Sequence, residues 1–282
     1  MNKILLPTDY SESSLMAIEY ASKLFDDHAC EFHIIHAYRL SRSGLAIMRK
    51  QYTETREYRK SESAAREDMR KMLLELKKKY EADPHIYRGF VTAQSLTDGI
   101  RQSVLELQGD LIVMATTGAS GLKEVFLGSN AVKVINRMKD CPVLLVPAGY
   151  SFVPVRKILF VNDFRRNFEA EEVLALASMA RMTTSSIALL YINDGNEFTS
   201  NQKKNREELL RLLEGIPVEE QQMPMDKFLS DIIEDYTASG EVNMLAMIKN
   251  KHSNLDKLLR EPVVKKVAFH SRIPFLVMPE VV

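Results

Sequence analysis

The sequence has few cysteines, and their placement excludes two kinds of cross-link. Cys30 and Cys141 are far apart and show neither CxxC nor Cys/His ligand spacing, so we expect no structural disulfide and no zinc site. His33 and His36 are three residues apart on an expected strand, which puts their rings on opposite faces. We therefore predict no metal site in this protein.

The sequence also lacks a net charge and a long apolar segment. Its 38 basic and 38 acidic side chains cancel, which leaves no positive field to attract nucleic acid. No apolar run approaches the roughly 20 residues that span a bilayer. The opening MNKILLPTDY lacks the pattern of a secretory signal. We predict a cytoplasmic protein that binds neither nucleic acid nor membrane.

The chain does contain an internal repeat. Its 282 residues suit two domains of about 140 residues each. KILLPTDYSE at 3–12 and KILFVNDFRR at 157–166 share Lys, Ile and Leu, and then an acidic residue at Asp9 and Asp163. CPVLLVP near residue 147 and IPFLVMP near the end of the chain match in the same way. We predict domains at 1–147 and 157–282, joined by a linker at 148–156.

Apolar strand-like runs alternate with helical patterns in both halves, which favours parallel sheets built from βαβ units. The expected strands are 3–7, 31–37, 85–91, 111–115 and 143–146 in the first half, and 157–161, 186–191, 218–222, 244–248 and 275–278 in the second. This pattern predicts an α/β fold of two tandem five-stranded, parallel, doubly wound (Rossmann-like) domains. We expect strand order 3-2-1-4-5 and a pseudo-twofold arrangement in which the fifth strands pair.

A polar insertion at 40–58 separates the second and third strands of the first half. Insertions of this length are typical of lids or interface arms. A solvated extension of the following helix is the alternative.

A glycine-containing segment, LIVMATTGASGLKEVFLGSNAVKVI, includes the fourth strand of the first half. Ligands of open parallel sheets bind beyond the carboxyl ends of the strands, where the strand order reverses. Gly118 and Gly128 allow a close backbone approach, and Ser129 and Asn130 open a helix whose amides attract anions. The segment therefore indicates a phosphate site, although the glycines could also serve a tight turn and a helix entry.

In these features the chain resembles the tandem-domain form of the universal stress protein family. The similarity lies in Pro7, Thr8 and Asp9, in the glycine segment and in CPVLLVP. Family members that bind ATP carry a glycine, a second glycine three positions on, and a third ten positions later followed by Ser or Thr. The matching positions here are Ala115, Gly118, Gly128 and Ser129, so the first glycine is replaced.

The resemblance implies that the first half binds ATP, with or without Mg. Asp9 and Ala37 would line the adenine and ribose end, and Met114 and Ala115 would form the floor. The expected binding residues are Pro7, Thr8, Asp9, Ala37, Met114, Ala115, Gly118, Gly128, Ser129 and Asn130.

The second half has changed at the phosphate positions. Aligned on Met114 and Met247, Gly118 becomes Lys251, Gly128 becomes Glu261 and Ser129 becomes Pro262. A carboxylate repels phosphate, and proline lacks the backbone donor. We predict one ATP per chain. Solvated charge, rather than a site for another anion, is the favoured interpretation of the cations Lys249, Lys251, His252, Lys257 and Arg260.

These observations predict a cytosolic stress-response protein that uses ATP as a regulatory or signalling ligand. The sequence has no activated nucleophile, metal-ligand cluster or GxxxxGK[ST] loop, so we expect no enzyme, and at most weak ATP hydrolysis assisted by Asp9. The alternatives are a ligand-free scaffold, a binder of another small molecule, or a nucleotide-dependent enzyme on this architecture. The two domains are expected to pair within the chain, and a further homodimer is left open.

Overall fold

The computed structural model describes residues 2–38, 56–81, 83–117, 128–193, 197–224, 229–238, 240–249 and 272–280. Grouped by spatial proximity, the chain forms two compact units, Met1–Met114 and Ala115–Val282. No helix in the described part of the chain combines the length and the apolar character needed to cross a membrane.

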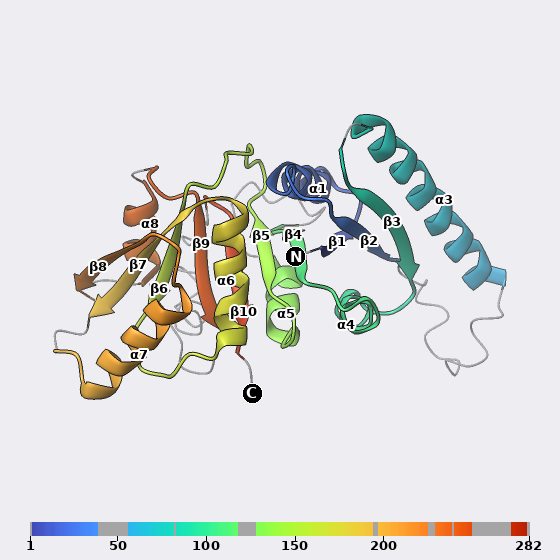
Figure 1. Cartoon of the computed structure of the whole chain (residues 1–282). Coiled ribbons are helices and arrows are strands. Elements are labelled where there is room, and N and C mark those ends of the chain that lie inside the picture. The colour runs from blue at the N-terminus through green and yellow to red at the C-terminus, as the bar shows by residue number, and fades with distance from the viewer. Residues whose placement is uncertain are drawn as a thin grey trace. The chain divides into compact units, whose positions relative to one another are not determined.

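The first unit is a parallel sheet with intervening helices (Figure 1). Strand β1 pairs with β2 and β4, and β2 pairs with β3. The central strands are buried along almost their whole length, as expected for a parallel sheet with helices on both faces. The elements are β1 (Lys3–Thr8), α1 (Glu12–Leu24), β2 (Glu31–Ala37), α3 (Arg56–Lys79), β3 (Ile86–Thr92), α4 (Leu96–Leu107) and β4 (Leu111–Ala115), whose last residue opens the second unit.

Helices cover both faces of this sheet. The side chain of Met69 on α3 lies where a Cβ at Gly89 of β3 would stand. On the same face, Ser22 of α1 is 3.2 Å from the hydroxyl of Tyr87. Helix α4 contacts β1 and β2 from the side opposite to α1 (Figure 1). The first unit is therefore doubly wound, as predicted.

The second unit contains the rest of the helices and strands. Strands β8, β7, β6, β9 and β10 lie side by side in this order, all parallel. Both repeats thus have the predicted strand order 3-2-1-4-5. The elements are α5 (Ser129–Arg137), β5 (Val143–Val146), β6 (Lys157–Asn162), α6 (Ala170–Met182), β7 (Ser186–Asn193), α7 (Ser200–Leu212), β8 (Val218–Pro224), α8 (Leu229–Ala238), β9 (Met244–Lys249) and β10 (Phe275–Pro279).

The fifth strands of the two repeats pair with each other. Strand β5 runs antiparallel to β10, with Leu144 opposite Leu276 and Val143 opposite Val277. Each strand covers an apolar edge that would otherwise be open to other chains, so this predicted pairing is confirmed. Strand β5 belongs to the second unit, whereas the repeat boundaries at 147 and 157 and the pseudo-twofold arrangement stay predictions.

The predicted insertion at 40–58 lies largely outside the described residues. Its last three positions, 56–58, belong to the first turn of α3.

Candidate functional site

The carboxyl end of β1 holds three of the predicted site residues. Pro7 and Thr8 end the strand, and Thr8 is buried with its hydroxyl 2.9 Å from that of Ser14. Asp9 is exposed, and its carboxylate accepts a hydrogen bond from the backbone N–H of Ser11, which caps α1. Asp9 therefore has a structural role in the turn into α1, in addition to any contact with a ligand.

Tyr10 is a feature of this edge that sequence reasoning missed. Its φ of +62° is rare for a large side chain, and its ring lies 4.3 Å from the ring of His36. The hydroxyl is buried without a hydrogen-bond partner among the described residues. Burial, with a smaller contribution from the Asp68 carboxylate, raises the pKa of Tyr10 to about 12. The phenol is therefore neutral and able to donate a hydrogen bond.

The end of β2 lies beside the end of β1. His36 is in register with Thr8, so Ala37 is the next residue along this edge. Nδ1 of His36 is 2.9 Å from the carbonyl oxygen of Thr8. Because a carbonyl can only accept, Nδ1 carries a hydrogen and donates it to this oxygen.

The end of β4 is buried. Met114 is 6% and Ala115 is 8% exposed, and their role as the floor of a site stays a prediction. Among the described residues other than glycine, positive φ occurs at Tyr10, Gln108, Phe164 and Thr184 and not at Ala115. Alanine in place of the family's glycine therefore causes no backbone strain at this position.

Gly128 contacts the residue that follows β4. Its backbone N–H donates to the carbonyl oxygen of Thr116 over 2.7 Å, and a Cβ at Gly128 would lie 2.8 Å from that same oxygen. The close approach of Gly128 to Thr116 requires glycine, and the N–H of Gly128 is used in this hydrogen bond. Gly118, predicted as a second phosphate contact, lies outside the described residues.

The start of α5 has no side-chain cap. Gly128 is the N-cap and makes no side-chain hydrogen bond, whereas α1, α4 and α7 are capped by Ser11, Ser95 and Thr199. Ser129 and Asn130 are exposed at the first turn. Within the described residues, no group accepts a hydrogen bond from their backbone N–H groups. Such a helix start favours a bound anion.

Lys249 is the one described residue among the basic residues of the second repeat that align with the phosphate segment of the first. Lys249 donates from Nζ to the carbonyl oxygen of Ile135 over 3.0 Å, so it supplies a hydrogen bond to a carbonyl near the end of α5. Lys251, His252, Lys257, Arg260, Glu261 and Pro262 lie outside the described residues.

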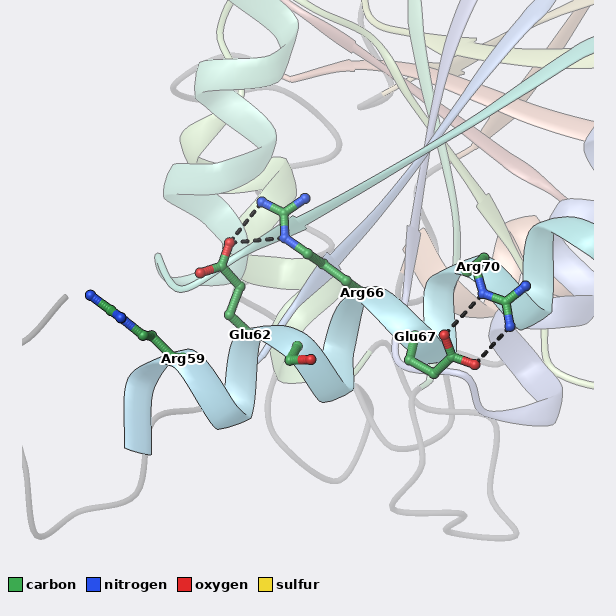
Figure 2. Close-up of a pocket in the computed structure, with 6 residues that line it drawn as sticks. Arg59, Glu62, Arg66, Glu67 and Arg70 are labelled. Atoms are coloured by element: carbon green, nitrogen blue, oxygen red, sulfur yellow. Dashed lines mark hydrogen bonds and ion pairs between the residues drawn. The ribbon is translucent and has the colours of Figure 1, made fainter. Parts of the chain in front are cut away.

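A shallow hollow of about 560 Å³ runs along α3. Figure 2 shows the side chains that line it. Glu62 pairs with Arg66 over 2.7 Å, and Glu67 pairs with Arg70 over 2.9 Å. Exposed pairs of this spacing are typical of a solvated helix face. Among the described residues, no group of three or more His, Cys, Asp and Glu could hold a metal ion.

Comparison with known proteins decides the family. The universal stress protein family model matches residues 1–147. The chain belongs to the universal stress protein family. A universal stress protein of Methanocaldococcus jannaschii is 31% identical over 145 residues, which are 51% of this chain and 81% of that protein.

Solved structures extend the likeness in fold over both repeats. The crystal structure of a universal stress protein from Archaeoglobus fulgidus covers 99% of this chain and 98% of its own, with a TM-score of 0.71 and 19% identity. The cytoplasmic domain of a prokaryotic cation chloride cotransporter covers 99% of this chain and 95% of its own, with a TM-score of 0.55 and 9% identity. The fold of this universal stress protein thus also occurs in a transporter, so function depends on the site.

Proposed function

We propose that this universal stress protein is a cytoplasmic stress-response protein whose first repeat binds one ATP, with or without Mg, as a regulatory ligand. The base and ribose would contact the ends of β1 and β2 at Pro7, Thr8, Asp9 and Ala37. Met114 and Ala115 would form the floor. The phosphates would contact Gly118, Gly128, Ser129 and Asn130.

The uncapped start of α5 is the observation that supports this proposal. Gly128 donates its N–H to Thr116 and supplies no side-chain cap. The next amides, on Ser129 and Asn130, are then the donors that an anion would use. A negative charge at an exposed helix start typically gains about 0.3–1 kcal/mol.

Asp9 favours binding over turnover. The carboxylate that would assist hydrolysis already accepts a hydrogen bond from Ser11 in the turn that begins α1. We therefore propose a binding protein with at most weak ATP hydrolysis. A ligand-free scaffold is the second candidate, because the contact of Gly128 with Thr116 gives this glycine a structural reason that is independent of phosphate.

Two substitutions at Gly128 test the proposal. Gly128→Ala introduces the clash with Thr116 alone, whereas Gly128→Glu adds a carboxylate beside the proposed phosphates. We expect Gly128→Glu to bind ATP roughly thirtyfold more weakly than Gly128→Ala, the equivalent of about 2 kcal/mol. Binding is measured by calorimetry, and nucleotide retained through purification is measured by chromatography after acid denaturation.

Thermal unfolding of both variants checks that they fold equally well. Equal ATP affinity in the two variants would show that the phosphates do not bind at the start of α5. A wild-type chain that neither retains nor binds adenine nucleotide would favour the scaffold.

A further inference from the structure

The second repeat has aromatic side chains at the edge where the first has its proposed base site. Asn162 is in register with Tyr191 as Thr8 is with His36. Phe164 follows Asp163 as Tyr10 follows Asp9, and its φ of +52° reproduces the same left-handed turn. Tyr191 and Phe164 are therefore the counterparts of His36 and Tyr10.

A third ring packs against both rings of this aromatic pair. Phe164 and Tyr191 are stacked with ring centroids 5.6 Å apart. The ring of Phe198 stands edge-on to Phe164 at 5.7 Å and tilted against Tyr191 at 4.4 Å. Phe164 is 1% and Tyr191 is 6% exposed, and Phe198 is half-buried. Such offset and edge-on contacts are favourable beyond the area that they bury.

Hydrogen bonds from α7 hold Phe198 in this position. Phe198 directly precedes Thr199, the N-cap of α7, which forms a capping box with Gln202. The side-chain amide of Gln202 donates to the carbonyl oxygen of Asp163 over 2.9 Å. The buried amide of Asn205 donates to the carbonyl oxygen of Phe164 over 2.8 Å. The first turns of α7 are thus fastened to the turn that follows β6.

We propose that Phe198 is a built-in occupant of the second repeat. Its ring packs on Phe164 and Tyr191, at the strand ends that correspond to the proposed base site of the first repeat, and this place accepts a planar aromatic heterocycle once the ring is removed. The place of the base rests on the proposed function. The site itself rests on the three rings and on the two hydrogen bonds from α7.

Phe198→Ala tests this proposal, with adenosine as a probe that needs no phosphate site. The variant should lose several degrees of melting temperature. Millimolar adenosine should restore part of this loss, and should slow hydrogen exchange in β7 and at the start of α7. In the wild-type chain adenosine should leave exchange in these segments unchanged. Because an aromatic base can stack on the rings of Phe164 and Tyr191 that the substitution exposes, the affinity of the second repeat for adenosine should rise on the order of tenfold or more.

Two further variants serve as controls. Leu174→Ala removes a 59% exposed side chain from α6 and should change neither the melting temperature nor exchange. Phe198→Leu keeps most of the apolar volume and should show weaker protection by adenosine than Phe198→Ala. A folded Phe198→Ala chain without protection in β7 and α7, or wild-type protection there, overturns the proposal. If instead the proposed site of the first repeat is wrong, adenosine will leave hydrogen exchange at the ends of β1 and β2 unchanged in the wild-type chain.

Discussion

At the scale of single residues, backbone geometry decides which of the family's glycines this chain can lose. Ala115 ends a strand without positive φ, so its methyl group causes no strain. A Cβ at Gly128 would instead lie 2.8 Å from the carbonyl oxygen of Thr116. The sequence marks both positions, but only the local contacts distinguish them.

Tyr10 and Phe164 show where sequence reasoning stops at this scale. Both have positive φ, a conformation that costs of order 1–3 kcal/mol and persists only where surrounding contacts enforce it. The repeat of an aromatic residue after Asp9 and Asp163 was visible in the sequence. Its backbone conformation was not, because it depends on rings that come from other strands.

Buried His33 makes stability depend on pH. Its ring is 2% exposed, and this burial lowers its pKa from 6.5 although the Glu31 carboxylate, 3.3 Å from Nε2, acts in the opposite direction. The unfolded chain therefore binds the proton more readily. The contribution of His33 to the free energy of unfolding is complete above about pH 6.5 and is lost as the pH falls through the folded pKa.

We predict that His33→Gln loses less stability than the wild type between about pH 7.5 and about pH 5. Urea denaturation at both pH values measures this difference. His28 is exposed, so His28→Gln should retain the wild-type pH dependence. If His33→Gln keeps the pH dependence of the wild type, another group causes the loss of stability at low pH.

At the scale of elements, continuous apolar runs made the strands predictable. Strands β3, with the sequence IYRGFVT, and β8, with the exposed sequence VEEQQMP, lack such a run, and β8 was located by its place in the repeat. Helix starts were less predictable, because caps such as Thr199 and Gln202 depend on side-chain geometry. Ser129 and Asn130, which are expected to bind phosphate, lie at the start of α5, but the missing side-chain cap there could not be foreseen.

The start of α6 depends on a partly buried ion pair. Nη1 of Arg166 is 2.8 Å from the carboxylate of Glu172, whose side chain is 1% exposed. The same carboxylate accepts a hydrogen bond from the N–H of Glu169. Arg166→Ala leaves a buried charge with less compensation and should lower the free energy of unfolding by about 2–3 kcal/mol.

Denaturant unfolding measures this loss, and Arg211→Ala is its control. Arg211 pairs with Glu208 on the exposed face of α7, where removal of the charge should have little effect. If both variants lose a similar amount of unfolding free energy, the burial of Glu172 does not determine the effect of Arg166→Ala.

At the scale of the whole molecule, the repeat was predictable because the opening and closing strands are both duplicated. The pairing of β5 with β10 followed from their apolar edges. The grouping of β5 with the second unit did not follow, because it depends on contacts that no local pattern encodes. In the second repeat, the ring of Phe198 packs against Phe164 and Tyr191.

Calorimetric titration of the intact chain with ATP measures whether only the first repeat binds nucleotide. We predict one ATP per chain in the wild type. Glu261→Gly should also bind one ATP, because Lys251 and Pro262 remain and Phe198 still packs on Phe164 and Tyr191. Two ATP per wild-type chain would contradict the account.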